Sequence, residues 1–297
     1  MANFPILQEI EGEWRSSKTV EIMGLRIPTY FTDNPQVLYD YIVNLKTRSD
    51  DVFVVSYPKS GTTWLQEIVW QIYHNGEVNS KRIEDRVPFL EEATKSKELR
   101  PDVASLPSPR LIKTHLSYEA IPKGTNEETT CKYIYIARNP KDVAVSNYKF
   151  HTSLGKDTGL NAPWEFYANL FVQGKTLWSH WDKHVLGWWK HRDDANVLFL
   201  KYEDLKKDLL KHVRIISEFL NKPLSDELLN RITEQCTFNG MMKNLKSYLL
   251  CETEDGLKFL RKGAVEDWKN FFTPQQSERF DKELLEKLDG TGLEFEM

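Results

Sequence analysis

Asp51-Val-Phe-Val-Val-Ser-Tyr-Pro-Lys-Ser-Gly-Thr-Thr-Trp64 carries the clearest structural signal in this chain. Its first half, residues 51–57, is a nearly continuous apolar run, which is typical of a strand buried on both faces of a sheet. Residues 62–73 are predicted to form a helix directly after it. The order of strand, loop and helix favours an α/β fold.

Strands and helices continue to alternate along the chain. Further strands are predicted at 110–114, 132–137 and 196–201, and helices at 140–151, 203–220 and 273–288. Residues 236–265 have weak periodicity and contain two turn-forming Asx-Gly pairs, so they are predicted to form a long loop. This order predicts a mostly parallel central sheet with helices on both faces and a P-loop-like strand-loop-helix.

The length of 297 residues allows one large domain or two small ones. With 40% hydrophobic residues, the chain has enough apolar side chains for a substantial core. We find no internal repeat, low-complexity tract or long Pro/Gly/Ser-rich linker that would separate two domains. A single domain over residues 1–297 is therefore expected.

Charge and composition narrow the classes of function. A formal net charge of -4 argues against generic nucleic-acid binding, which needs a basic surface. Residues 1–14 lack the basic start of a signal peptide, and no stretch approaches the roughly 18 apolar residues that span a bilayer. Cys131, Cys236 and Cys251 lack metal-ligand spacing and are expected to be free thiols. We expect a cytoplasmic protein without nucleic-acid or membrane partners.

The loop between the first buried strand and its helix is predicted to bind an anion. Backbone N–H groups and the positive end of the helix can converge there on a phosphate. Lys59 adds a charge, Gly61 allows close approach of the backbone, and Thr62 and Thr63 can donate hydrogen bonds. The Walker sequence is absent because the lysine precedes the glycine, so an ordinary ATPase is disfavoured. The alternative is a plain strand-to-helix turn.

Four further motifs accompany this loop: Lys113-Thr-His115, Tyr135-Ile-Ala-Arg-Asn-Pro-Lys-Asp-Val-Ala-Val-Ser146, Lys201-Tyr-Glu-Asp204 and Phe259-Leu-Arg-Lys-Gly263. In order and spacing, the five motifs resemble the cytosolic sulfotransferase family over nearly the whole chain. The resemblance implies a donor, 3′-phosphoadenosine-5′-phosphosulfate (PAPS), and a small phenol, alcohol, steroid or amine as acceptor. It further implies transfer of the sulfuryl group to a hydroxyl or amine of the acceptor, with adenosine 3′,5′-bisphosphate (PAP) as the second product.

The resemblance also implies which residues hold the nucleotide. The loop from Lys59 to Trp64 would cradle the 5′-phosphate and the sulfuryl group, while Arg138 and Ser146 would bind the 3′-phosphate. An arginine can pair with a phosphate through two hydrogen bonds, although a structural ion pair is the alternative. The implied nucleotide-binding set is Lys59, Ser60, Gly61, Thr62, Thr63, Trp64, Arg138, Ser146, Tyr202, Cys236, Thr237, Phe238, Met241, Phe259, Arg261, Lys262 and Gly263.

The match of Lys113-Thr-His115 to the family makes His115 the implied catalytic base. A lone histidine is usually structural, but its unperturbed pKa lies near the working pH of an enzyme. Lys59 and Lys113 are the implied stabilisers of the transferring group, because catalysis here should be mainly positioning and charge stabilisation. A sulfuryl group carries a single negative charge, so no metal is expected to be required.

The implied acceptor site is largely aromatic. Its predicted residues are Phe31, Phe89, Lys113, His115 and Phe150, and the segment of Trp164 is also implied to line it. Such a pocket favours flat or apolar acceptors, although each aromatic residue could equally belong to the core.

Three positions depart from the family pattern. Cys236 stands where threonine is usual, which leaves one nucleotide contact open, and Glu266 replaces a usual glycine. The segment Lys269–Glu278 resembles the family's dimerisation motif but has Pro274 in place of valine. Because proline lacks an N–H donor for pairing between chains, we expect at most a weak homodimer.

Other interpretations were compared with this one. A P-loop kinase needs a lysine after the loop glycine and a metal-binding acid, and a non-catalytic nucleotide sensor would not need Lys59, Lys113 and His115 together. His180, His184 and His191 lack the His-Glu-x-x-His pattern of a metal site, and are expected to be solvated or in the core. The tryptophans at helical spacing are likewise expected in the core, namely Trp178, Trp181, Trp188 and Trp189.

Overall fold

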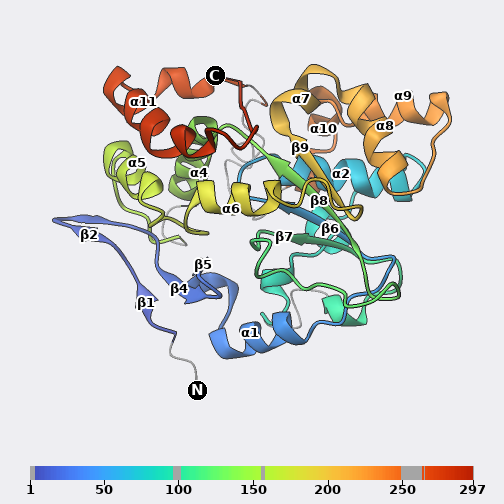
Figure 1. Cartoon of the computed structure of the whole chain (residues 1–297), viewed down its shortest axis with the longest axis horizontal. Helices are drawn as coiled ribbons and strands as arrows, with labels where there is room; N and C mark the ends of the chain where they lie inside the picture. Colours follow the sequence, from blue (N-terminus) through green and yellow to red (C-terminus); the bar gives the residue numbers. More distant parts are fainter. Residues whose placement is uncertain (1–3, 96–101, 155–157, 249–262, 264, 297) are drawn as a thin grey trace.

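A parallel sheet lies at the centre of the computed structural model, which describes residues 4–95, 102–154, 158–248, 263 and 265–296. The order of its strands is β7-β6-β8-β9 (Figure 1). Its strands are β6 (Val52–Ser56), β7 (Leu111–Thr114), β8 (Lys132–Ala137) and β9 (Val197–Lys201). Each begins and ends within one residue of its predicted bounds, and the predicted α/β class is confirmed.

The two faces of this sheet have separate apolar cores. Phe53 and Val55 of β6 belong to one core, and Val52 and Val54 belong to the other. Successive side chains of a strand point to opposite faces, so a strand covered on both sides must be apolar at every position. This explains the continuous apolar run in the sequence.

Helices cover both faces. One core is shared with α2 (Thr62–Tyr73), α3 (Ile83–Arg86), α7 (Tyr202–Lys207), α8 (Leu209–Phe219), α9 (Asp226–Gln235) and α10 (Phe238–Met242). The other is shared with α1 (Pro35–Asn44), α4 (Pro140–Ser153), α5 (Trp164–Val172), α6 (Trp181–Trp189) and α11 (Pro274–Phe280). In Figure 1, α8 and α9 lie together at one end of the molecule, and α5 and α11 lie at the other.

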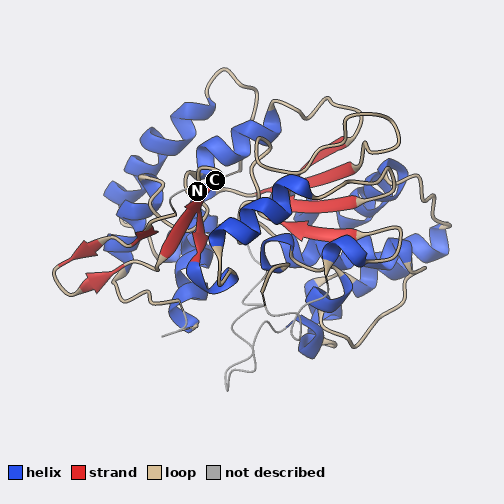
Figure 2. Cartoon of the chain, turned by 90° about the horizontal axis from the view of Figure 1, so that it is seen from below, coloured by secondary structure: helices blue, strands red, loops and turns tan. Residues whose placement is uncertain are grey.

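Short antiparallel strands precede the parallel sheet and were not predicted. Strands β1 (Ile6–Leu7), β4 (Thr19–Ile22) and β5 (Leu25–Pro28) pair with one another, and β2 (Ile10–Glu11) pairs with β3 (Trp14–Arg15). Figure 2 shows them at the side of the molecule, apart from the parallel strands. Strand β5 leads into a 3₁₀ turn at Thr29–Phe31, which brings Phe31 to the cavity described below.

Two predicted segments are divided differently in the structure. The helix expected at 203–220 is wrong as a single element, because the backbone of Asp208 is not helical, with φ of -143° and ψ of 80°, and its Oδ1 accepts a hydrogen bond from the N–H of Lys211 at 3.0 Å. Asp208 thus ends α7 and caps α8. The helix expected at 273–288 is α11 followed by a π-helix (Asp281–Leu285) and a 3₁₀ turn (Glu286–Leu288).

The loop predicted at 236–265 is wrong in its first part. Thr237 caps the short helix α10, with Oγ1 accepting from the N–H of Gly240 at 3.0 Å, and a 3₁₀ turn follows at Leu245–Tyr248. Residues 249–262 and 264 lie outside the described part of the chain, and Cys251 is one of them. Cys131 and Cys236 are buried free thiols.

Pro274 occupies the first position of α11. Thr273 and Gln276 form a capping box around it. The first N–H of a helix has no partner within the helix, so proline is well tolerated at this position. Dimerisation through Lys269–Glu278 stays a prediction.

Within the described residues, no helix is both long enough and apolar enough to cross a bilayer.

Glu266 has left-handed backbone, with φ of 64°. Its N–H donates to Oδ2 of Asp142 at 2.9 Å, and the N–H of Trp268 donates to Oδ1 of the same carboxylate at 3.1 Å. This anchoring to α4 holds the backbone of residue 266 in a conformation that favours glycine.

Replacing Glu266 with Gly is expected to stabilise the protein. A non-glycine residue with left-handed backbone costs on the order of 1 kcal/mol, so Glu266→Gly should exceed Glu266→Ala in the free energy of unfolding by about that amount. Both variants lack the carboxylate, which makes alanine the matched control. Urea unfolding measures the difference, and equal stabilities would contradict a strained backbone at this residue.

Candidate active site

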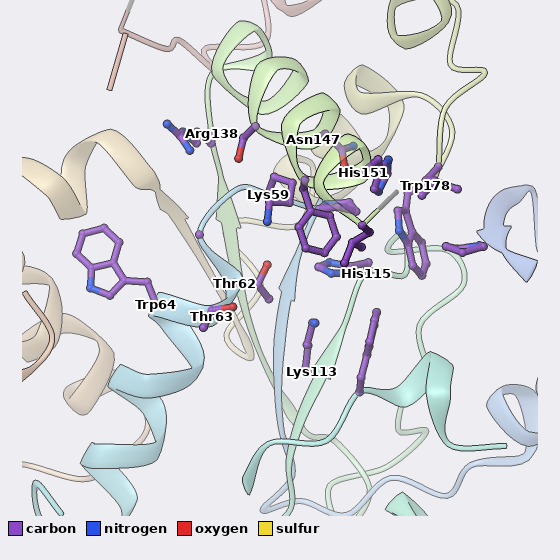
Figure 3. Close-up of a pocket in the computed structure, with 18 of the residues that line it drawn as sticks. Lys59, Thr62, Thr63, Trp64, Lys113, His115, Arg138, Asn147, His151 and Trp178 are labelled. Carbon is purple, nitrogen blue, oxygen red and sulfur yellow. The ribbon is translucent and has the colours of Figure 1, made fainter. Parts of the chain in front are cut away.

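The carboxyl ends of all four parallel strands meet at one cavity of about 570 Å³. Lys59 follows β6, His115 follows β7, Arg138 follows β8 and Tyr202 follows β9, and all four side chains line the cavity (Figure 3). The expected position of ligands in an open α/β sheet is this edge. The volume lies within the range of small-molecule sites.

The loop after β6 has the geometry of an anion site. Gly61 is the N-cap residue of α2 with φ of 107°, and no side chain in the described part of the chain caps this helix. The first N–H groups of α2 are therefore available to a ligand. A Cβ at residue 61 would lie 2.7 Å from Cδ2 of Tyr202, so only glycine fits there.

The ring of His115 is held in one tautomer. Its Nδ1 lies 2.7 Å from the carbonyl oxygen of Ser56, and because a carbonyl can only accept, Nδ1 carries the proton. Nε2 then has a free lone pair. Burial and the nearby charge of Lys113 lower the pKa of His115 well below its ordinary value, so the ring is neutral at neutral pH. This is the protonation state that a general base needs.

The backbone around His115 is fixed from two sides. Oε1 of Glu91 accepts from the N–H of His115 at 2.6 Å and from the hydroxyl of Thr114 at 2.9 Å. Nε2 of His184 donates to the carbonyl of His115 at 2.9 Å, and the hydroxyl of Tyr135 donates to Nδ1 of His184 at 2.8 Å. Burial raises the pKa of Glu91 to about 8 and lowers that of His184 to about 4. Neither residue was predicted in this role.

Two cavity lysines lie over aromatic rings. Nζ of Lys59 is 3.9 Å from the ring centre of Phe150, and Nζ of Lys113 is 4.0 Å from that of Phe89. Such cation–π contacts hold a positive charge in place without neutralising it. Both lysines line the cavity.

Arg138 contacts both an aromatic ring and a carboxylate. Its guanidinium lies 4.3 Å from the ring centre of Tyr202, and Nη2 is 3.3 Å from Oδ2 of Asp142. The structural ion pair is thus present, and the same side chain also lines the cavity. The ring of Tyr202 meets that of Trp64 edge-on, with 5.3 Å between centroids.

Aromatic rings surround His115. Phe89 and Trp178 lie with their centroids 5.0 Å and 5.3 Å from that of His115, and Phe31 lies 5.1 Å from Phe89. Trp178 belongs to the apolar core, as expected, and it also lines the cavity. Its backbone φ of 69° places it in the turn before α6, outside the helical spacing. Trp181 and Trp188 are fully buried as expected.

Most predicted site residues lie together on the cavity wall. They are Phe31, Lys59, Gly61, Thr62, Thr63, Trp64, Phe89, Lys113, His115, Arg138, Ser146, Phe150, Tyr202, Phe238, Met241 and Gly263. Ser60, Trp164, Cys236 and Thr237 do not line it, and Trp164 packs against the apolar core. Cys236 is buried at the end of α9, where its carbonyl accepts from Nε1 of Trp64 at 2.7 Å, and Thr237 caps α10. Phe259, Arg261 and Lys262 lie outside the described residues.

Helix α4 adds cavity residues that were not predicted. Asn147, His151 and Leu154 line the cavity on the same face as Phe150. Phe150, His151 and Leu154 follow Asn147 by three, four and seven residues, which places all four on one side of a helix. The spacing from Phe150 could have indicated them in the sequence.

The histidines considered as metal ligands have other surroundings. His184 is buried and hydrogen-bonded as described above, and Nδ1 of His191 lies 2.9 Å from Oδ2 of Asp194. Among the described residues, no three histidine, cysteine or acidic side chains come together as a metal-binding group.

Comparison with known proteins agrees with this geometry. The sulfotransferase domain family matches residues 49–292. The chain belongs to the sulfotransferase family. The predicted enzyme class, a PAPS-dependent sulfotransferase, is therefore confirmed.

Individual relatives cover most of the chain. Sulfotransferase 1C2 of Homo sapiens is 37% identical over 94% of this chain and 95% of its own length. Amine sulfotransferase of Oryctolagus cuniculus is 41% identical over 85% of both chains. The crystal structure of mouse sulfotransferase SULT7A1 complexed with PAP has a TM-score of 0.73 and 34% identity, covering 91% of this chain and 94% of that one.

Acid is expected to destabilise this sulfotransferase partly through His151. Burial, with a smaller contribution from Lys59, lowers the pKa of His151 to about 3, whereas an unfolded histidine titrates near roughly 6.5. A folded pKa below the unfolded one gives stability that is present above roughly pH 6.5 and is lost as the pH falls. His151→Gln removes this titration. Between about pH 5.5 and 4, the free energy of unfolding of His151→Gln should therefore fall less steeply with decreasing pH than that of the wild type. The two slopes should differ by about 1.4 kcal/mol per pH unit.

Denaturant unfolding at several pH values measures both slopes. Thr152→Ala, on the exposed side of the same helix, is the control and should follow the wild-type slope. Identical slopes for His151→Gln and the wild type would contradict a buried neutral imidazole.

Proposed function

We propose that this enzyme transfers the sulfuryl group of PAPS to a hydroxyl or amine of a small, aromatic or apolar acceptor, giving a sulfate ester or sulfamate and PAP. The observation that carries the proposal is the neutral His115, with Nδ1 bound to the carbonyl of Ser56, in a cavity that also contains Lys59 and Lys113. A positioned base and two cations at one cavity suit the transfer of an anionic group to a hydroxyl.

The nucleotide half of the cavity is proposed to hold the donor. Residues Lys59 to Trp64 would bind the 5′-phosphate and the sulfuryl group through the N-terminus of α2, and Arg138 with Ser146 would bind the 3′-phosphate. Trp64 and Tyr202 would flank the adenine. The residues present fit such a ligand, because the helix N-terminus lacks a side-chain cap and Gly61 leaves room for close approach. The bisphosphate complex of the mouse relative supports this assignment.

The chemistry proposed for the protein is proton acceptance and charge stabilisation. PAPS supplies the sulfuryl group. Nε2 of His115 accepts the proton of the acceptor hydroxyl as the oxygen forms its bond to sulfur, and the bond from sulfur to the phosphate oxygen breaks. Lys59 and Lys113 stabilise the negative charge on the transferring group and on the leaving phosphate. No metal is assigned a role, since the lysines provide the positive charge.

The acceptor is proposed to lie among the aromatic rings near His115. Phe31, Phe89, Phe150 and Trp178 give this end of the cavity an apolar wall. Because one relative is an amine sulfotransferase, amines are included with phenols and alcohols among the proposed acceptors.

We also propose a single domain over residues 1–297, a cytoplasmic location, and a weak homodimer through Lys269–Glu278.

The donor assignment can be tested by ligand-dependent thermal stability. A ligand at 100 times its dissociation constant stabilises the native state by about 2.7 kcal/mol. PAP should therefore raise Tm clearly more than ATP or ADP at equal concentration. A larger shift with ATP would favour a kinase instead. Transfer of labelled sulfate from PAPS to a panel of phenols, alcohols, steroids and amines then tests catalysis, and separates an enzyme from a nucleotide sensor.

Replacing His115 with Ala is expected to remove the base. A positioned base supplies about 10²- to 10⁴-fold in rate, so kcat should fall by at least 10²-fold. The dissociation constant of PAP should stay nearly unchanged, because the nucleotide is assigned to other residues. His212→Ala, on α8 away from the cavity, is the control and should retain kcat. Near-normal turnover of His115→Ala would rule out the base assignment.

Replacing Arg138 with Ala is expected to weaken recognition of the 3′-phosphate. A charge-assisted pair with phosphate contributes about 1.5 to 3 kcal/mol, so the affinity for PAP should fall by at least about tenfold. The affinity for adenosine 5′-phosphate, the 3′-hydroxyl analogue of PAP, should change much less. Calorimetric titration of both nucleotides measures the two losses, and equal losses would indicate that Arg138 acts only through its contact with Asp142.

A further inference from the structure

One face of α4 brings two polar side chains into the acceptor part of the cavity. Asn147, Phe150, His151 and Leu154 all line it, at helical positions that share one side. Figure 3 shows Asn147 and His151 on this helix beside Trp178, on the far side of the cavity from Trp64. Two of the four residues are polar although their neighbours are apolar.

Asn147 is fully buried, and neither its amide nitrogen nor its amide oxygen has a hydrogen-bond partner in the described part of the chain. Leaving a buried polar group unsatisfied costs about 1 to 3 kcal/mol, so such groups normally have a partner. Because Asn147 lines the cavity, a bound molecule can supply that partner.

His151 follows one helical turn later and is 4% exposed. Its lowered pKa, described above, makes the imidazole neutral, so one ring nitrogen donates and the other accepts. Asn147 and His151 together therefore offer donors and acceptors without a net charge. The pair itself therefore offers an ionised group no opposite charge in exchange for its hydration.

Resting on the proposed function, we propose that Asn147 and His151 recognise a second, uncharged polar group of the acceptor, such as a hydroxyl, carbonyl or carboxamide, at a distance from the group that receives the sulfuryl. The aromatic rings around His115 provide apolar contact, but apolar contact alone does little to fix the orientation of an acceptor. A few convergent polar groups in an apolar pocket fix the orientation of a ligand. The pair on α4 thus selects acceptors that carry polar groups at both ends.

The test compares two phenols of equal length, one with a terminal carboxamide and one with a terminal alkyl group. The wild type should have a higher kcat/KM for the carboxamide, by about tenfold or more. Asn147→Leu replaces the amide with an apolar side chain of similar size. It should lower kcat/KM for the carboxamide by about 10- to 100-fold and leave that for the alkyl phenol within about threefold. Thr152→Ala is the control on the exposed side of α4 and should match the wild type with both acceptors.

Several outcomes would overturn the inference. A wild type that sulfates both phenols equally, or that prefers a matching carboxylate, would contradict recognition of an uncharged polar group. An equal loss on both phenols in Asn147→Leu, together with a lower Tm, would show that Asn147 is structural. His151→Phe gives an independent second variant with the same expected selectivity. A wild type that sulfates neither phenol and no other acceptor would refute the proposed function itself, whereas PAP-dependent stabilisation would still report on the nucleotide site.

Discussion

The hydrogen bond from Nδ1 of His115 to the carbonyl of Ser56 is the contact on which the site depends. It joins the ends of two neighbouring parallel strands, since β6 ends at Ser56 and His115 follows β7. Oγ of Ser56 also lies 2.6 Å from Oγ1 of Thr62, the first residue of α2. One residue at the end of the central strand therefore fixes the tautomer of His115 and contacts the first residue of α2.

Burial sets the protonation state of the histidines at this site, and aromatic rings hold the lysine side chains in place. The imidazoles of His115, His151 and His184 are all buried, and burial keeps each of them neutral. The positive charges of Lys59 and Lys113 are held over phenylalanine rings, which attract a cation but do not neutralise it. The cavity therefore combines neutral imidazoles with two lysine side chains held over aromatic rings.

The features best predicted from the sequence are those that depend on a local residue pattern. Residues 51–64 specified the buried strand, the loop and the helix, because a strand covered on both faces must be apolar and Gly61 is the only residue type that fits beneath Tyr202. The roles of Glu91 and His184 could not be predicted, since each binds the backbone of His115 from a different part of the chain. Helix ends were also missed where one capping side chain, such as Asp208, decides them.

Helix α4 spans the two halves of the cavity. Its amino-terminal half follows Arg138 and contains Ser146, the two residues proposed to bind the 3′-phosphate, whereas His151 and Leu154 are near its carboxyl end. Specificity for the acceptor can therefore be varied by a combinatorial library confined to the last two turns of this helix, with the donor-facing turns left intact. For an engineer of regioselective sulfation, a single short segment of the gene is then the natural target for diversification.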